Sequence, residues 1–404
     1  MHEYPGLIFA ALLIFVYGLF SRLSERSPVS APMVFVAVGI LVSPLGLNLH
    51  ELRLTSTAVH LIAELTLVLV LFIDASTIDV QSFIRERGLT LRLLAIGLPL
   101  TMLLGMALAV PIFDDMNLWT IALMALILSP TDAALGQTVV TSPLVPKKIK
   151  EAINVESGLN DGIALPPILA CIAALSVTAA DSAGAHYWVG FTLKQLLLGP
   201  ILGALVGWVG GKLVDRASNN GWMHPTFQRL AAISLAILAF ALAENFHGNG
   251  FIAAFFGGLM LGVRTHAVRE RIQEFGEAEG QLLGLFVFLI FGLAAVPQAV
   301  GYWDDRAWGY AILSLTVIRM LPVALSLMGT KLTRFSIAFI GWFGPRGIAS
   351  VLYLIIVVNK LGVPGYERML AIIVLTVLLS VFLHGITAVP LSRLYASHAA
   401  EDGT

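Results

Sequence analysis

The sequence predicts an all-α polytopic membrane protein, and three observations carry this prediction. Hydrophobic residues make up 58% of the 404 residues and charged residues only 12%, whereas roughly a quarter of a soluble domain is charged. The apolar residues form continuous runs of about twenty residues, as a membrane helix requires, and not the short alternating stretches of a membrane barrel. The net charge of −1 provides no basic surface for nucleic acid.

Thirteen apolar runs follow one another along the chain, and no polar linker between them is long enough to separate two domains. We therefore expect a single membrane domain over residues 1–404, with a short cytoplasmic tail at 391–404. The runs are close to the length that a membrane helix needs. In chain order, the predicted spans cover residues 5–21, 30–47, 57–76, 91–111, 117–141, 149–178, 190–214, 228–245, 250–265, 280–299, 307–330, 333–359 and 366–390.

Basic residues between the runs predict the orientation of the chain. Lys and Arg number 17 in the loops on one side and 5 in the loops on the other, and the basic side of a membrane protein faces the cytoplasm. The N-terminus should then lie outside and the C-terminus in the cytoplasm. The acidic pairs at 114–115 and 304–305 fall on the outer side. These features predict a multi-pass protein of the cell inner membrane.

Two of the runs are interrupted in the middle. The run at 117–141 contains the letters SPTD at residues 129–132, where proline removes a backbone donor and clashes with the preceding turn. The run at 333–359 contains the letters GPRG at residues 344–347. Backbone that is not helical survives within a membrane only where it is buried in protein or lines a polar cavity. Both breaks are therefore candidate functional positions.

The two breaks occupy matching places. Residues 5–178 and 228–390 form two predicted repeats of six spans joined by a linker helix at 190–214, and the interrupted span is the fifth of each repeat. The first repeat begins outside and the second inside, so their topology is inverted. Paired interrupted helices in inverted repeats indicate the binding site of a transporter. Two unrelated proline kinks are the alternative.

Charged residues inside the runs are the next candidates, because a charge near the middle of a bilayer costs at least a few kcal/mol. Asp132 could offset the exposed N–H ends at the first break, and Arg346 the exposed C=O ends at the second. The carbonyls freed around Thr131 also suit a hard cation. The charged residues at depth are Glu64, Asp132, Glu156, Asp161, Arg319 and Arg346, with Asp74 and Glu244 near span ends.

The run at 149–178 carries the most polar segment, NVESGLNDG at residues 154–162. Glu156 and Asn160 are four residues apart and share one helix face, whereas Ser157 and Asp161 share the next face. Hydroxyl, carboxylate and carbonyl oxygens suit Na⁺, Li⁺ or H⁺ better than a soft metal. A purely structural salt bridge is the alternative interpretation of Glu156.

The letters SPTDA at 129–133, ESGLNDG at 156–162 and FGPRGIAS at 343–350 resemble the NhaP-type sodium/proton antiporters. These belong to the monovalent cation:proton antiporter superfamily, in the electroneutral branch that has Asn-Asp at its site. The resemblance covers nearly the whole chain and implies a homodimer whose core domain moves against a dimerisation domain. It also implies that Asp161 carries either the cation or the proton. Its further implications are Thr131 and Asp132 as ligands, Glu156 and Ser157 beside them, and Arg319 as the partner of Glu156.

We therefore expect a secondary active antiporter that exchanges Na⁺ or Li⁺ for H⁺, with Na⁺ held by Asp161, Asp132, Thr131 and Ser157. Asn160 stands where electrogenic relatives have a second Asp, so one-for-one, electroneutral exchange is expected. A K⁺/H⁺ antiporter of the same fold stays open, because oxygen ligands alone do not set the size of a site. An organic-anion symporter fits less well, because acids outnumber arginines at depth.

Other classes of function are not expected. No nucleophile–base pair, metal motif or nucleotide-binding loop occurs within the runs, so we expect neither an enzyme nor an organic cofactor. The single cysteine, Cys171, cannot form an intrachain disulfide, and no Cys/His cluster suggests zinc. The repeated carbonyl loops and charged rings of channel filters are also missing from the sequence.

Overall fold

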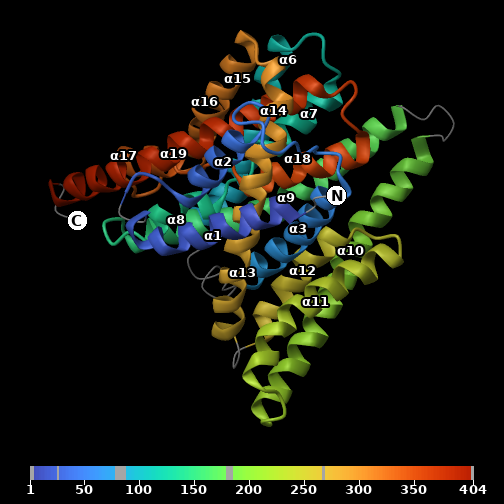
Figure 1. The fold of residues 1–404 in the computed structure, drawn as a ribbon. Coiled ribbons are helices and arrows are strands. Elements are labelled where there is room, and N and C mark those ends of the chain that lie inside the picture. Colours follow the sequence, from blue (N-terminus) through green and yellow to red (C-terminus); the bar gives the residue numbers. More distant parts are fainter. Residues whose placement is uncertain (1–3, 25–26, 78–87, 179–184, 266–268, 402–404) are drawn as a thin grey trace.

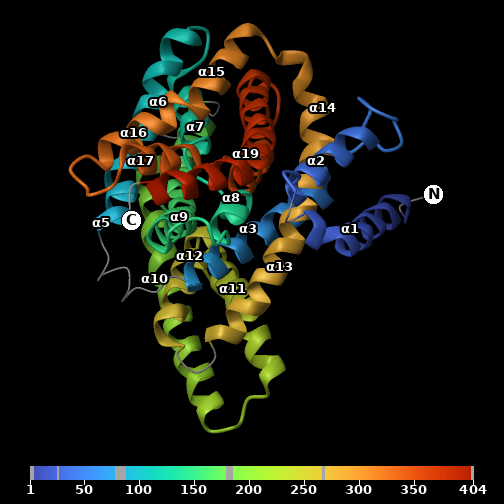
Figure 2. The same ribbon diagram turned by 90° about the vertical axis from the view of Figure 1, so that its left-hand side faces the viewer.

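The computed structural model describes residues 4–24, 27–77, 88–178, 185–265 and 269–401, and within these ranges all regular structure is helical. The helices pack against one another in a single body (Figure 1), and the view turned by 90° shows the N-terminal helix at its edge (Figure 2). The first half of the chain contains α1 (Tyr4–Ser24), α2 (Ala31–Val42), α3 (Thr57–Thr77), α5 (Gly88–Arg92), a π-turn at Leu93–Gly97, α6 (Leu98–Ile112), α7 (Leu118–Ile127), α8 (Ala133–Val140) and α9 (Lys147–Thr178).

The second half begins and ends with a helix of 35 residues, α10 and α19. The turn elements at 291–302 continue α13 without a loop. The elements are α10 (Ala185–Asn219), α11 (Pro225–Asn245), α12 (Gly250–Arg264), α13 (Arg269–Ile290), a π-turn at Phe291–Ala295, α14 (Val296–Ala299), a 3₁₀ turn at Val300–Tyr302, α15 (Asp305–Leu315), α16 (Val317–Ser326), α17 (Arg334–Trp342), α18 (Ile348–Leu361) and α19 (Glu367–Glu401).

Length and composition of these helices identify a membrane protein. Within the described ranges, 8 helices or helix pairs are long and apolar enough to cross a membrane. Five shorter apolar helices accompany them, at residues 8–22, 31–42, 118–127, 250–263 and 348–361. Two of these short helices, α7 and α18, are halves of the predicted interrupted spans, and both breaks are present, at residues 128–132 and 343–347.

Two predicted spans differ from the helices observed, each for a local reason. The second span ends at Val42 and not at residue 47, because Pro44 holds Ser43 in an extended conformation. The span at 307–330 is broken at Thr316, whose hydroxyl bonds back to the Ile312 carbonyl and weakens the helix. The segment predicted as a tail at 391–404 is helical up to Glu401, as a continuation of α19, and Tyr395 packs there against α17.

Helices α3, α10, α11 and α12 form a group that we call the scaffold, and α10–α12 lie side by side in both views (Figures 1 and 2). Glycines allow the backbones to meet. Gly203 and Gly207 of α10 lie against the backbone of α12, and a Cβ atom at either would overlap a carbonyl oxygen. Gly258 and Gly262 of α12 meet α3 in the same way. Small residues at helix contacts are typical of membrane bundles, which lack a hydrophobic driving force between helices.

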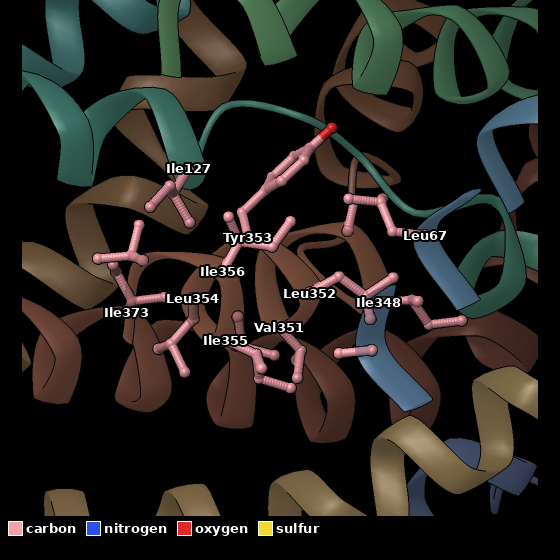
Figure 3. Close-up of a cluster of buried hydrophobic side chains, with 14 of the residues drawn as sticks. Leu67, Ile127, Ile348, Val351, Leu352, Tyr353, Leu354, Ile355, Ile356 and Ile373 are labelled. Carbon is pink, nitrogen blue, oxygen red and sulfur yellow. The ribbon is translucent and has the colours of Figure 1, made fainter. Parts of the chain in front are cut away.

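Helix α18 lies at the centre of the main apolar core. Each residue from Ile348 to Val358 is buried. Leu67 of α3, Ile127 of α7 and Ile373 of α19 surround it in Figure 3. This packing holds the start of α18, and with it the second break, in a fixed place beside α7.

Candidate ion-binding site

The two breaks cross and are joined by direct hydrogen bonds. The Asp132 amide donates to the Pro345 carbonyl at 2.8 Å. One turn into α18, the Ser350 hydroxyl donates to the Ile127 carbonyl at the end of α7, also at 2.8 Å. We call residues 128–132 and 343–347 the crossing. Backbone groups that the breaks remove from the helices are thus partly paired with each other, as buried polar groups require.

The Asp132 carboxylate lies between the first turns of two half-helices. It accepts from the Leu135 amide of α8 at 3.3 Å and from the Ile348 amide of α18. The side chain is only 6% exposed. A carboxylate at two helix N-termini offsets the partial positive charge of both. This geometry is the one that the sequence predicted for Asp132.

Arg346 binds free carbonyl groups at the C-terminal ends of broken helices. Its guanidinium donates to the Gly344 carbonyl at 2.5 Å, beyond the end of α17, and to the Ser314 carbonyl at 3.3 Å. Its own amide donates to the Ser380 hydroxyl at 2.7 Å. Arg346 is fully buried, and in the part of the chain that the structure describes it forms no ion pair. The break at Thr316, which the sequence did not reveal, provides the free carbonyl near Ser314.

The predicted pair of Glu156 and Arg319 is present. The Arg319 guanidinium donates to both carboxylate oxygens of Glu156, at 2.6 and 2.8 Å, and each side chain is 1% exposed. Gly344 packs directly against this guanidinium, where a Cβ atom would overlap it. The paired geometry joins α9 to α16 and is the strong, bidentate form of a charged hydrogen bond.

Three polar side chains of α9 and the first break meet beside this pair. The hydroxyls of Thr131 and Ser157 lie 2.9 Å apart, and the Asn160 amide donates to the Thr131 hydroxyl at 2.7 Å. Glu156 and Asn160 are four residues apart in the continuous helix α9, as the sequence predicted. Asn160 and the neighbouring Ser157 both reach Thr131, whereas Glu156 binds Arg319.

Asp161 differs from the other buried charges. It is 7% exposed, and within the described structure its Oδ1 atom has no hydrogen-bond partner. The Tyr353 hydroxyl donates to its backbone carbonyl at 2.8 Å and holds α9 against α18. The carboxylates of Asp74 and Asp132 are near enough to interact with it electrostatically. Asp161 is therefore a buried carboxylate with an oxygen left for a cation or a proton.

Asp74 is the residue near this site to which sequence reasoning gave no role. It lies in the last turns of α3, near enough to Asp161 and Asp132 to interact with both electrostatically. The sequence shows an acidic residue near the end of an apolar run. Only the packing of α3 against its neighbours reveals that this residue lies near Asp161. Two other acids are explained locally. Glu244 accepts from the Gly250 amide at 2.8 Å at the start of α12, and Glu64 lies one turn from His60.

A cavity leads to the crossing from the side that carries most of the basic loop residues. Its volume is about 840 Å³, and α1, α2, α8, α13 and α19 line it. Ile348, whose amide binds Asp132, forms part of its wall. Gln281 of α13 donates to Gln137 of α8 across it at 3.4 Å. Within the described residues, no three His, Cys, Asp or Glu side chains gather as a metal site.

Comparison with known proteins decides the family. A sequence profile described as "Sodium/hydrogen exchanger, transmembrane" matches residues 9–394. The chain belongs to this family. It is 25% identical over 393 residues to the K(+)/H(+) antiporter NhaP2 of Shewanella baltica, covering 96% of this chain and 66% of that protein. It is 25% identical to the K(+)/H(+) antiporter NhaP of Alkalimonas amylolytica over 91% of this chain and 63% of that protein.

The fold also has close structural neighbours. The sodium proton antiporter MjNhaP1 from Methanocaldococcus jannaschii, in a structure at pH 8, superposes with a TM-score of 0.77 over 95% of this chain and 100% of that chain, at 18% identity. A second structure of MjNhaP1 gives 0.74 at 17% identity. The chain of this exchanger-family member thus covers the whole MjNhaP1 chain, but less than two thirds of the curated relatives above.

Proposed function

We propose that this exchanger-family chain is a secondary active antiporter that exchanges a monovalent cation for H⁺. The free oxygen of Asp161 carries this proposal. Of the other buried charges, Glu156 and Arg319 bind each other, and Asp132 and Arg346 bind helix ends. Among the described acidic residues at the crossing, Asp161 is the one whose carboxylate has a buried oxygen without a partner. A removable charge at that place is what an exchanger needs.

In this mechanism Asp161 binds either the cation or the proton. The hydroxyls of Thr131 and Ser157 and the free Oδ1 of Asn160 supply neutral oxygen ligands, and Asp132 adds negative charge beside them. Cation binding displaces the proton because both need the same carboxylate. Only the neutralised site crosses the low-dielectric barrier, since an unpaired buried charge costs several kcal/mol. The two ions thereby compete for one carrier, which couples their movement.

The arrangement in the membrane is part of the proposal. We propose thirteen spans in two inverted repeats, with the N-terminus outside and the C-terminus in the cytoplasm of an inner-membrane protein. The large cavity opens on the basic side, so the described conformation faces the cytoplasm. Movement of the crossing and α9 against the scaffold would expose Asp161 to the other side. A homodimer held by the scaffold fits the resemblance to NhaP-type antiporters and provides a fixed frame for this movement.

We favour Na⁺ or Li⁺ as the cation, because only a small set of oxygen ligands surrounds Asp161. K⁺ is the second candidate, because the curated relatives named above are K⁺/H⁺ antiporters. An organic anion is disfavoured, since the guanidinium groups of Arg319 and Arg346 are already bound to protein oxygens. With one free carboxylate, one cation replaces one H⁺, and the exchange is electroneutral.

Purified protein in liposomes with an internal pH dye tests the function. Na⁺, Li⁺, K⁺ and Rb⁺ are added outside in turn. An ion that is transported should enter in exchange for internal H⁺, so that the internal pH rises. Asp161→Asn should abolish the signal, because an amide neither carries a proton nor neutralises a cation, and Asp305→Asn on the outer loop serves as the control. Activity above about a tenth of wild type in Asp161→Asn contradicts the assignment.

The same liposomes test the stoichiometry. A K⁺/valinomycin potential of either sign, applied without an initial cation or pH gradient, should cause no change of internal pH when Na⁺ is the exchanged ion. A pH change that reverses with the sign of the potential means that net charge moves, and that Asp132 or Asp74 also releases a proton.

A further inference from the structure

The cavity on the basic side has a chemical character that cation exchange does not require. None of the described residues that line it is acidic, whereas Arg393 of α19 lies at its wall. Most of its polar side chains are neutral hydroxyls and amides: Ser21, Ser27, Ser30, Gln137, Thr138, Thr141, Ser142, Gln281 and Ser392. Such a lining is suited to an anion, because hydroxyls and a guanidinium donate hydrogen bonds and no carboxylate repels the ligand.

Two of these hydroxyls lack partners. Ser392 is 2% exposed, and its Oγ atom is buried with no hydrogen-bond partner within the described structure. The Oγ atom of Ser30 is also buried and unpaired. Ser30 lies close to Gly385 of α19. Val389 and Ser392, one and two turns further along α19, line the same cavity. A buried hydroxyl without a partner is costly, and a ligand in the cavity would supply the missing hydrogen bonds of both groups.

The first turn of α2 adds a third set of donors. Ser30, Ala31 and Pro32 line the cavity at the start of this 12-residue helix. Pro32 has no N–H and the Val34 amide donates to the Ser30 carbonyl, so the donors of this turn are the amides of Ala31 and Met33. Ser30 is the N-cap residue, but its side chain does not bond the amides of the first turn. Those amides also have no acceptor within the helix. A helix N-terminus with free amides binds an anion through its N–H groups and its dipole.

We infer that this cavity binds the phosphate head group of an anionic amphiphile, held by Ser30, Ser392, Arg393 and the N-terminus of α2. An apolar wall beside these donors accounts for the tail of the ligand: Tyr17 and α13 residues Leu285 and Phe288 line the same space, with Val389. The volume of about 840 Å³ accommodates a small amphiphile, which inorganic phosphate alone would not fill.

The bound amphiphile also regulates transport, a role that rests on the proposed function. The cavity is the route from the basic side to Ile348 and the crossing. It also lies between α8 and α13, which hydrogen-bond across it through Gln137 and Gln281. A ligand wedged there blocks the access of the cation to Asp161 and the movement of α8 against α13. Binding is therefore inhibitory.

Binding is tested on the full chain in a zwitterionic detergent by calorimetric titration with dihexanoyl phosphatidate, a soluble phosphate amphiphile. Wild type should bind it, and Ser392→Ala and Arg393→Gln should each weaken the Kd by about tenfold, because each removes a hydrogen bond to a charged group. Ser397→Ala on the exposed face of α19 and Arg334→Gln at the start of α17 are matched controls that should bind like wild type. No binding by wild type, or equal binding by all four variants, overturns the inference.

Two further arms identify the source of the phosphate and separate binding from function. Dihexanoyl phosphatidylcholine should bind at least about tenfold more weakly, since its head group carries no net charge. Inorganic phosphate that competes as well as the amphiphile shows instead that a free anion occupies the site, which overturns the lipid assignment. Inhibition by the phosphatidate is then read in the liposome exchange. Binding without inhibition rejects only the regulatory role of the ligand. A protein that binds the phosphatidate but does not exchange ions rejects the proposed function and leaves the binding site standing.

Discussion

The crossing and the scaffold are held together by different means. In the crossing, charged side chains bind backbone groups that the broken helices leave free: Asp132 at the N-ends and Arg346 at the C-ends. In the scaffold, glycines such as Gly203 and Gly258 bring helix backbones into direct contact, with few buried charges. The scaffold therefore depends on shape, whereas the crossing depends on charge as well.

This difference shows how one buried carboxylate can be free to titrate. Every other buried charge at the crossing has a structural partner that stays with it. Asp161 is the exception and can change its charge without losing a hydrogen bond of its Oδ1 atom. If that interpretation is correct, substitutions should separate into those that unfold the protein and those that only stop exchange.

The largest effect on stability is expected for Arg319→Ala. The change leaves the Glu156 carboxylate buried and unpaired, which costs about 3–5 kcal/mol. Melting of the detergent-solubilised protein, followed by tryptophan fluorescence, measures the loss. Glu156→Met combined with Arg319→Met is the matched control, because removing both charges together should recover most of the stability. A melting temperature equal to wild type in Arg319→Ala would show that the pair does not form.

The second largest loss of stability is expected for Gly203→Val, which tests the helix contacts of the scaffold. The added side chain overlaps the Ala253 carbonyl, so α10 and α12 must separate, at a cost of about 1–3 kcal/mol or more. Gly280→Ala in α13 is the control, since nothing lies within 4 Å of a Cβ atom there. The fraction of monodisperse protein and its melting temperature report the effect. Unlike the charge variants, Gly203→Val should lose the same stability at every pH, and a pH-dependent loss would contradict a role in shape alone.

A smaller effect is expected when the two aspartates are compared directly. Asp132→Asn weakens the cap of two half-helices and should cost about 1–2 kcal/mol. Asp161→Asn should leave the free energy of unfolding within about 0.5 kcal/mol of wild type, because the free oxygen of Asp161 makes no hydrogen bond. Both are measured by the same melting curve. Equal losses in the two variants would mean that Asp161 is as structural as Asp132.

The smallest effect concerns the outer loops, away from both regions. Arg368 donates to Asp115 at 2.7 Å and to Asp304 at 2.6 Å. Partial desolvation of Asp304 raises its pKa, but the Ala307 amide and Arg368 outweigh this, so the pKa is lowered from 3.8. The contact therefore stabilises the folded protein above pH 3.8, and this contribution disappears as the pH falls through the lower folded-state pKa.

Arg368→Gln should reduce this acid dependence without abolishing it, because the Ala307 amide still binds Asp304. Near neutral pH the change should be well below 1 kcal/mol, because the pair is largely exposed. Melting temperatures between about pH 5 and pH 3 measure it against Arg53→Gln, which pairs with the exposed Glu51 instead. An unchanged acid dependence in Arg368→Gln would assign the effect to other carboxylates.

The sequence by itself determined the class of the protein, because each relevant signal is local. Run length and apolar composition predict membrane helices, and a proline in the middle of a run removes a backbone donor wherever the helix packs. Both breaks, the acids of α9 and the compensating roles of Asp132 and Arg346 could therefore be predicted. The pairing of Glu156 with Arg319 came from the resemblance to NhaP-type antiporters and not from spacing.

The tertiary structure decided which charges are bound and which one is free. Glu156 meets Arg319 across 163 residues of sequence, and Asp132 meets Ile348 across 216. Three further features likewise depend on neighbouring helices: the break at Thr316, the contact of Asn160 with Thr131 and the nearness of Asp74 to Asp161. A side chain's partner depends on which helices pack around it, and that packing is decided by apolar surfaces and close backbone contacts distributed over the whole chain.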